Sequence, residues 1–341
     1  MSLTFSQHHP LKPLNTFGMD ARARDFCELN ALADLPALLD SPAYQTGPVL
    51  WLGGGSNLLF TRDYPGLVVK LGLRGIRLLE ENGDERIVEA AAGENWHDFV
   101  LHTLSRGWYG LENLSLIPGT VGASPIQNIG AYGVEAKDHI HQVVCADLER
   151  GGAELTLDAA DCRFGYRDSV FKHEAAGRLL VVAVRFRLSR APRLRTGYGD
   201  IQQELTAAGV VSPTPRDVSD AVIRIRSSKL PNPAELGNAG SFFKNPVLPA
   251  EQAQALLARH PALPHYPAAD GQIKLAAGWL IDQCGLKGYR DGDAGVHARQ
   301  ALVLVNYGAA SGEQMRALAD KVRAEVRRRF GVELEPEPIV L

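Results

Sequence analysis

The feature that most constrains this chain is a glycine-rich stretch near its centre, because such a stretch does not pack like an ordinary helix or strand. Residues 117–133 read Ile-Pro-Gly-Thr-Val-Gly-Ala-Ser-Pro-Ile-Gln-Asn-Ile-Gly-Ala-Tyr-Gly, with four glycines, two prolines and no charged residue. Small residues allow backbone N–H groups to close on a ligand. The stretch therefore predicts a binding loop, with a plain surface turn as the alternative.

A second glycine-rich segment lies upstream, where residues 49–60 read Val-Leu-Trp-Leu-Gly-Gly-Gly-Ser-Asn-Leu-Leu-Phe. It is not a Rossmann fingerprint, because Leu58 stands where the third glycine of G-x-G-x-x-G belongs. The chain also lacks the G-K-[ST] of a P-loop. Two such loops indicate one extended ligand that carries phosphate, held by backbone N–H groups.

Length and charge limit the remaining possibilities. A chain of 341 residues predicts two or three domains. Lysine and arginine number 36 against 39 acidic residues, and this net charge of -3 argues against binding nucleic acid or an anionic membrane. The N-terminus lacks a signal sequence and no window approaches about 18 consecutive apolar residues, so we expect a cytoplasmic protein.

The apolar spacing predicts a mixed α and β chain. Strands are expected at 24–29, 49–52, 66–71, 179–188 and 301–306, and helices at 96–106, 201–208, 217–228, 250–259, 274–283 and 312–330. Two hairpins are expected, one over 77–90 with Asn82-Gly83 as a type I′ turn and one over 139–157 around Gly151-Gly152. The tail, 331–341, is strand-like with two prolines, which suits a sheet edge.

Metal and thiol chemistry find little support. Two histidine pairs share a strand or a helix, but neither has a third ligand nearby, so we expect no metal site: His139 with His141, and His97 with His102. The cysteines form no C-x-x-C pair and are expected to be buried thiols: Cys27, Cys145, Cys162 and Cys284.

Three polar residues are better candidates for chemistry. Arg167 lies in Gly-Tyr-Arg-Asp-Ser, Ser241 in Asn-Ala-Gly-Ser-Phe-Phe-Lys-Asn-Pro, and Glu337 in Leu-Glu-Pro-Glu. Taken singly, each also fits an ordinary role, as an ion-paired arginine, a turn serine or an exposed carboxylate. Their occurrence together with the two glycine loops is what favours a functional role.

In this combination the chain resembles the UDP-N-acetylenolpyruvoylglucosamine reductase (UDP-N-acetylmuramate dehydrogenase) family of flavoenzymes. The resemblance runs nearly end to end, from Asn-Thr-Phe-Gly at 15–18 through both glycine loops and Cys-Arg-Phe-Gly-Tyr-Arg-Asp-Ser at 162–169 to Ala-Gly-Trp-Leu-Ile-Asp at 277–282 and Leu-Glu-Pro-Glu at 334–337. The Tyr-Gly-Asp segment at 198–200 resembles the corresponding loop in the type I branch of this family. After Glu337 the chain departs from the family, because it reads Pro-Ile-Val-Leu where the family continues with Val-Arg, which leaves the anchoring of Glu337 open.

The resemblance implies an α+β fold with an FAD-binding region of the vanillyl-alcohol-oxidase (PCMH) type, made of two subdomains, and a separate α+β substrate domain. The implied boundaries are 1–70 for the first subdomain, with the tail 331–341 returning to it, 71–218 for the second, and 219–330 for the substrate domain. FAD would be bound non-covalently by residues of the two glycine loops: Gly53, Gly54, Gly55, Ser56, Asn57, Ser115, Ile117, Pro118, Gly119, Thr120, Gly122, Ala123, Gln127, Asn128, Gly130, Tyr132 and Gly133.

The resemblance also implies the reaction. NADPH would reduce the flavin, and hydride would then pass to the enolpyruvyl group of UDP-N-acetylglucosamine enolpyruvate, giving UDP-N-acetylmuramate for peptidoglycan and so for cell shape and division. Arg167 and Glu337 would face the substrate carboxylate, and Ser241 would donate the proton. The nucleotide part would be bound by four further residues: Tyr198, Lys229, Asn245 and Gln300.

Two alternatives remain open from the sequence. One is a flavin-dependent alcohol oxidase of the same fold, and the other is a nucleotide-binding regulatory module without catalysis. We expect a monomer that binds neither nucleic acid nor membrane.

Overall fold

The protein is described here by a computed structural model, which covers residues 3–341. The chain divides into two compact units. The first contains most of residues 3–228, and the second contains residues 10–22, 55–64 and 229–341. The three domain boundaries expected from the sequence remain predictions.

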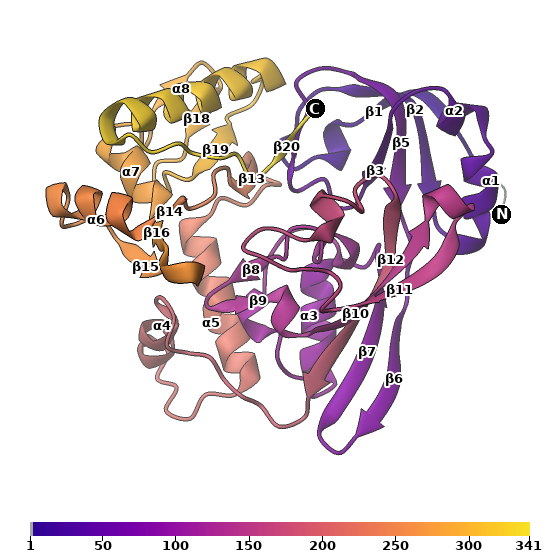
Figure 1. The fold of residues 1–341 in the computed structure, drawn as a ribbon, viewed down its shortest axis with the longest axis horizontal. Coiled ribbons are helices and arrows are strands. Elements are labelled where there is room, and N and C mark those ends of the chain that lie inside the picture. Colours follow the sequence, from indigo (N-terminus) through magenta and orange to yellow (C-terminus); the bar gives the residue numbers. More distant parts are fainter. Residues whose placement is uncertain (1–2) are drawn as a thin grey trace. The chain divides into compact units, whose positions relative to one another are not determined.

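The first unit is built on two sheets. The larger has the strand order β11-β10-β12-β7-β6 and is antiparallel throughout, and the smaller has the order β1-β2-β5-β3 with β3 and β5 parallel (Figure 1). Its elements are β1 (Ser6–Pro10), β2 (Arg22–Leu29), α1 (Leu35–Leu39), α2 (Pro42–Gln45), β3 (Val49–Leu52), β5 (Tyr64–Leu71), β6 (Ile76–Asn82), β7 (Glu85–Ala91), α3 (Trp96–Ser105), β8 (Gly130–Ala131), β9 (Val134–Glu135), β10 (Ile140–Asp147), β11 (Ala153–Asp158), β12 (Leu179–Ser189), α4 (Ile201–Ala207) and α5 (Pro215–Lys229).

The three central strands of the five-stranded sheet, β10, β12 and β7, are buried on both faces, whereas the edge strands β6 and β11 are largely exposed. On β10, Val143 and Cys145 join the core formed with α3, whereas Val144 and Ala146 join the core formed with β2, β5 and α1. This alternation is the period of two that a strand imposes. On the α3 face, Trp96 packs on Phe186 with 5.8 Å between the ring centroids.

Both hairpins predicted from the sequence are present. β6 pairs with β7, and β10 pairs with β11 around two glycines of positive φ, as expected. The predicted turn in the first hairpin is wrong by one residue, because Asn82 is paired with Glu85 and the turn is Gly83-Asp84. Gly83 has φ +55°, whereas Asp84 has no positive φ, so the turn is not type I′.

The helices of the first unit follow their sequence signals. α3 begins after Asn95, whose side chain accepts a hydrogen bond from the Asp98 amide at 3.1 Å, and ends before Gly107 at φ +70°. α4 packs against α5, which buries Val218, Val222 and Ile225 along one face at helical spacing.

The second unit contains a four-stranded sheet of order β13-β19-β18-β17, a three-stranded sheet of order β14-β16-β15 and three helices. Its elements are β4 (Leu58–Leu59), β13 (Gly237–Ser241), β14 (Val247–Leu248), α6 (Ala250–Arg259), β15 (His265–Pro267), β16 (Ile273–Leu275), α7 (Ala277–Gln283), β17 (Arg290–Asp291), β18 (Ala294–Val296), β19 (Val303–Asn306), α8 (Gly312–Phe330) and β20 (Ile339–Val340).

The long helix α8 lies against β18, β19 and α7 (Figure 1). Its bounds agree with the prediction. A capping box between Ser311 and Gln314 begins it and Gly331, at φ +69°, ends it. Its buried residues recur every three or four positions: Met315, Leu318, Ala319, Val322, Val326 and Phe330.

The expected thiol burial is confirmed for three cysteines and is partial for Cys284. Burial raises the pKa of Cys27 to about 11 and the pKa values of Cys145 and Cys162 to about 12. These thiols are therefore protonated at neutral pH and are not nucleophiles.

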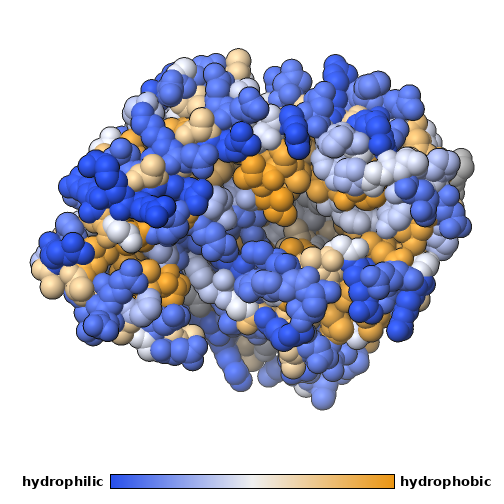
Figure 2. All heavy atoms as spheres, turned by 45° about the horizontal axis from the view of Figure 1, so that its top comes forward, coloured by the Kyte–Doolittle hydropathy of each residue, from blue (hydrophilic) through white to orange (hydrophobic). Residues whose placement is uncertain are grey.

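No helix within residues 3–341 is both long enough and apolar enough to span a bilayer. The same residues hold no group of three or more His, Cys, Asp and Glu side chains arranged for a metal ion. On the face in Figure 2, hydrophilic side chains cover most of the surface and apolar residues form smaller patches between them.

Candidate functional site

The two glycine-rich loops meet in the first unit. A Cβ atom added to Gly54 would lie 2.7 Å from the Cα of Gly119, and one added to Gly53 would lie 2.6 Å from the Oγ1 of Thr120. Real Cβ atoms do not approach other atoms this closely, so glycine is required at both positions. The close contact explains why two loops distant in sequence are both rich in glycine.

This meeting point offers unpaired hydrogen-bond donors. Within residues 3–341, the backbone N–H groups of Gly53, Gly54, Gly119 and Thr120 donate to no protein acceptor. The Lys70 ammonium lies beside them and donates to the Gly53 carbonyl, and burial lowers the pKa of this lysine. Converging N–H groups with a nearby cation suit a diphosphate, so the loops fit the phosphates of FAD.

Sequence reasoning missed Lys70. It lies in a strand that is otherwise buried and apolar, and a lysine in such a strand was the available signal.

The second half of the long loop is braced by Asn128, which is fully buried at φ +45°. Its Oδ1 accepts from the Lys137 amide at 3.0 Å, and its Nδ2 donates to the Gly165 carbonyl at 2.9 Å and to Glu135 at 3.2 Å. Because the side chain is used in this way, contact of Asn128 with a ligand is left to its backbone. The bracing also ties the glycine loop to the segment that carries Arg167.

Arg167 has φ +55° and lies half-buried beside the glycine loop. Its Nη2 donates to the Gly130 carbonyl at 2.9 Å, and its guanidinium lies 5.4 Å from the centre of the Tyr166 ring. A positive φ is costly for a non-glycine residue, so the fold holds this arginine in a strained position.

The Tyr198 loop packs on the end of the glycine loop. A Cβ on Gly133 would lie 3.2 Å from the Cβ of Tyr198, and a Cβ on Gly199 would lie 3.8 Å from the Tyr132 ring. Tyr198 itself is 46% exposed. Its ring is thus presented at the surface beside residues expected to bind the cofactor.

In the second unit, the chain tail lies along the strand that carries Ser241. The Glu337 amide donates to the Phe242 carbonyl at 2.8 Å, next to Ser241 in sequence. The Ser241 hydroxyl has no hydrogen-bond partner among residues 3–341. Ser241 and Glu337 are therefore brought together, whereas Arg167 belongs to the first unit.

Asn57 settles the anchoring that the sequence left open. Its Nδ2 donates to the Glu337 carbonyl at 3.2 Å, and its own carbonyl accepts from the Ile339 amide at 3.0 Å. β20 then pairs in parallel with β4, and the Leu341 carbonyl accepts from the Thr61 amide at 2.8 Å. The backbone around Glu337 is fixed on both sides despite the short tail.

The residues expected to bind substrate are partly used within the fold. The Oδ1 of Asn245 accepts from the Ala277 amide at 3.0 Å at the start of α7, while its Nδ2 donates to no residue in the described part of the chain. Gln300 accepts from the Leu302 amide at 3.4 Å, and the Leu302 carbonyl accepts from the Phe242 amide at 2.7 Å. Lys229 is exposed at the end of α5.

Ser115 is the expected cofactor residue whose side chain is most engaged elsewhere. Its hydroxyl lies 2.8 Å from the Glu112 carbonyl, to which it donates, and 2.7 Å from the hydroxyl of Ser219 on α5. Sequence reasoning missed this link between the loop and α5.

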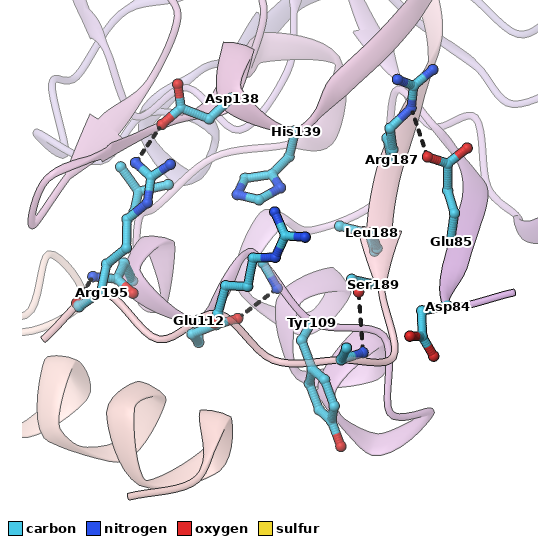
Figure 3. A pocket seen from close by; sticks show the side chains of 15 residues that line it. Asp84, Glu85, Tyr109, Glu112, Asp138, His139, Arg187, Leu188, Ser189 and Arg195 are labelled. Atoms are coloured by element: carbon cyan, nitrogen blue, oxygen red, sulfur yellow. Dashed lines mark hydrogen bonds and ion pairs between the residues drawn. The ribbon is translucent and has the colours of Figure 1, made fainter.

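A separate polar pocket of about 410 Å³ lies in the first unit, beside the first hairpin and β12 (Figure 3). Its acidic and basic groups largely neutralise one another, because Arg195 pairs with Asp138 at 3.0 Å and Arg187 pairs with Glu85 at 3.4 Å. None of its lining residues is among those expected to bind FAD or substrate. The pocket is therefore not the expected site.

Comparison with known proteins agrees with the family resemblance that the sequence motifs indicate. A family model for the UDP-N-acetylenolpyruvoylglucosamine reductase C-terminal domain matches residues 232–341, and a model for an FAD binding domain matches residues 29–153. A structure of UDP-N-acetylenolpyruvylglucosamine reductase from Thermus caldophilus superposes with a TM-score of 0.68 at 24% identity, covering 100% of this chain and 99% of that one. These matches confirm the expected α+β fold with a flavin-binding region and a separate C-terminal domain.

Curated relatives named UDP-N-acetylenolpyruvoylglucosamine reductase extend over the whole chain. The protein from Chromobacterium violaceum is 75% identical over 341 residues and that from Pseudomonas syringae 56% identical over 339, covering 100% and 99% of both chains. The protein from Neisseria meningitidis is 56% identical over 330 residues, covering 96% of this chain and 95% of its own. With such identity over nearly the whole of both sequences, this chain belongs to the UDP-N-acetylenolpyruvoylglucosamine reductase family.

Proposed function

We infer that this protein is an FAD-containing, NADPH-dependent reductase that converts UDP-N-acetylglucosamine enolpyruvate to UDP-N-acetylmuramate in peptidoglycan precursor synthesis. The observation that carries this conclusion is 75% identity over the entire chain to a protein named for the reaction. The alternative of an alcohol oxidase is not favoured, because the family match includes the C-terminal domain of the reductase.

FAD, when bound, supplies reversible hydride chemistry between NADPH and the substrate. Its diphosphate would be held by the N–H groups where the two glycine loops meet, with Gly53, Gly54, Gly119 and Thr120 as the donors. The remaining residues expected from the two loops line the rest of the cofactor.

Arg167 binds the substrate carboxylate. Hydride addition to the terminal carbon of the enolpyruvyl group creates negative charge that this carboxylate takes up as an enolate. A planar guanidinium matches a carboxylate with two parallel hydrogen bonds, and its attraction grows as the charge develops. The hydrogen bond to the Gly130 carbonyl orients the guanidinium for this role.

Ser241 donates the proton that completes the reduction. The enolate carbon is a strong base, so a well-placed neutral hydroxyl is sufficient as the acid. The absence of a protein partner for this hydroxyl within residues 3–341 leaves it available to the substrate. Glu337, whose backbone is tied to the neighbouring Phe242, faces the same carboxylate and shares a proton with it.

The UDP part of the substrate is bound by residues that present polar groups to solvent. Lys229 supplies a compact positive charge for the diphosphate, and Tyr198 covers the nucleotide. Asn245, through its Nδ2, and Gln300 complete the contacts.

The same proposal places the protein in the cytoplasm, where NADPH and nucleotide sugars are available, and makes it a monomer. Size-exclusion chromatography with light scattering tests the oligomeric state, and cell fractionation tests the location.

One experiment tests the function directly. Visible absorption of the anaerobic protein should bleach after one equivalent of NADPH and recover after UDP-N-acetylglucosamine enolpyruvate. A protein that cannot be reconstituted with FAD would contradict the proposed function. Bleaching followed by recovery with oxygen alone, and not with the UDP-sugar, would support the oxidase instead.

A further inference from the structure

Leu116 adopts an unusual backbone conformation directly before the glycine loop. Its φ is +59°, in the left-handed region, which is sterically unfavourable for a leucine. The residue follows the short 3₁₀ helix Glu112–Leu114 and its C-cap Ser115, and is followed at once by Ile117-Pro118-Gly119. The direction in which the loop leaves this point therefore depends on Leu116 being held in that conformation.

Both backbone polar groups of Leu116 are held by side chains. Its N–H donates to the Nδ1 of His97 at 3.0 Å, and its carbonyl accepts from the Nε of Arg226 at 3.2 Å. His97 is the second residue of α3 and Arg226 lies near the end of α5. Side chains from two helices therefore hydrogen-bond to the backbone of one loop residue.

A third contact supports the same arrangement. The hydroxyl groups of Ser115 and Ser219 lie 2.7 Å apart, and both residues are fully buried. The two contacts to α5 are one residue apart in the loop, which fixes the position of the segment as well as the φ of Leu116.

We propose that His97 is a positioning residue for the flavin: its neutral imidazole holds Leu116 in the left-handed conformation that presents the Gly119 and Thr120 N–H groups. Arg226 holds the carbonyl of the same residue from the opposite side. This inference rests on the proposed function, because it assigns those N–H groups to the diphosphate of FAD.

The geometry requires one protonation state. A backbone N–H can donate to Nδ1 only when that nitrogen carries no proton, so His97 is neutral with its proton on Nε2. Burial lowers the pKa of His97, and the nearby cations Arg226 and Arg216 of α5 lower it further, against an opposite effect of Asp98 on α3. The neutral form is therefore favoured at neutral pH.

Retention of FAD should therefore depend on pH. A group whose pKa is depressed in the ordered state loses its stabilising interaction as the pH falls through that depressed pKa. Protonated His97 would point an N–H at the Leu116 N–H, so the loop loses its support. FAD should be retained most tightly at neutral pH and released faster in acid.

The test uses the full-length holoprotein and the rate at which FAD leaves it on dilution, followed by flavin fluorescence between about pH 5 and 8. His97→Ala should release FAD about fivefold to twentyfold faster at neutral pH, because the partly buried Leu116 N–H loses its acceptor. His97→Asn places an oxygen where Nδ1 stands and cannot be protonated. It should release FAD within about twofold of the wild-type rate at neutral pH and lose the acceleration in acid.

The matched control is His102→Asn, one and a half turns further along α3. The pKa of His102 is also lowered by burial, but its ring lies against Trp108, with centroids 6.1 Å apart. This variant should keep the wild-type release rate and its pH dependence.

The inference is overturned if His97→Ala releases FAD at the wild-type rate, or if His97→Asn is as impaired as His97→Ala. A wild-type protein that never binds FAD would instead contradict the proposed function. Circular dichroism of each variant separates a failure to fold from a loss of flavin, and His97→Asn, as the conservative change, keeps the test open if His97→Ala does not fold.

Discussion

The residues expected to perform the chemistry occupy positions that folding alone does not favour. Arg167 and Tyr132 both have positive φ, and the Ser241 hydroxyl lacks a partner among the described residues. Strain and unsatisfied groups of this kind persist where the surrounding structure enforces them, and they concentrate at functional sites. These residues therefore lower the stability of the fold in exchange for groups that are placed to react.

Ser241→Ala should separate the two half-reactions. Reduction of the flavin by NADPH should stay close to the wild-type rate, because Ser241 has no role in it. Oxidation by the UDP-sugar should slow by about 10²–10⁴-fold, because the proton donor is lost. Stopped-flow absorption measures both steps, and the exposed Ser212 offers a control, Ser212→Ala, that should alter neither. Wild-type turnover in Ser241→Ala would remove this residue from the mechanism.

Among the elements, the two glycine loops depend on each other for their shape. Gly54 faces the Cα of Gly119, and Gly53 faces the side chain of Thr120. A larger residue at position 54 would displace the Gly119 backbone, and one at position 53 would displace the Thr120 side chain. The proposed binding site for the diphosphate therefore depends on both loops together.

Gly54→Ala should reduce retention of FAD by at least about tenfold, because the new methyl group would push the Gly119 backbone away. The ratio of flavin to protein absorbance after purification measures the effect. Gly197→Ala is the matched control, since a Cβ at Gly197 meets nothing within 4 Å and its φ is not positive. Full retention of FAD in Gly54→Ala would show that the two loops need not touch.

The five-stranded sheet carries a cross-strand ion network centred on Glu89 of β7. Arg185 of β12 donates to it at 2.9 Å, and Arg77 of β6 bonds to its other oxygen. Burial acts to raise the pKa of Glu89, but the hydrogen bonds from the two arginines outweigh it, and the pKa is lowered. The network therefore stabilises the ionised carboxylate within the sheet.

Glu89→Gln should lower the free energy of unfolding by about 1–2 kcal/mol at neutral pH. Because the pKa of Glu89 is lowered in the folded state, its stabilisation is complete above the ordinary value of about 4.3 and is lost as the pH falls through the lowered pKa. The denaturant midpoints of wild type and variant should therefore differ at neutral pH and converge at acidic pH. Glu80→Gln, at an exposed position of β6, should show little difference at either pH. A gap that stays constant into strong acid would contradict this account.

At the scale of the whole chain, the C-terminal tail packs against a segment of the second unit that comes from early in the sequence. Contacts join residues 280 positions apart, from Asn57 to Glu337 and from Thr61 to Leu341. The backbone of Glu337 is thus positioned by a segment from the first fifth of the chain. The tail pairs with β4 through Ile339 and Val340, soon after Glu337.

Deletion of residues 339–341 should slow oxidation of the flavin by the UDP-sugar about tenfold and leave reduction by NADPH unchanged, because β20 no longer fixes the backbone beside Glu337. Rapid-reaction absorption of the two half-reactions measures this split. Val340→Ala keeps the backbone pairing and changes a side chain that is 40% exposed, so it should behave as wild type. Equal slowing of both half-reactions would point to a general loss of structure.

The sequence by itself determined the local features and the chemistry. The bounds of α6 and α8, both hairpins, the two glycine loops and the family all follow from short patterns of apolar spacing, caps and motifs. These patterns are legible because each depends on neighbours within a few residues. The turn at Gly83-Asp84 was mispredicted because the register of the paired strands, and not the preference of Asn82-Gly83, fixed its position.

Only the tertiary structure decided which distant segments meet. The contact of Gly54 with Gly119, the support of Leu116 by His97 and Arg226, and the anchoring of Glu337 by Asn57 join segments with no local signal in common. Each depends on where the sheets and helices place their ends, and that placement results from core packing over the whole unit. The sequence therefore predicted which groups are expected to act, while the fold determined which groups hold them in position.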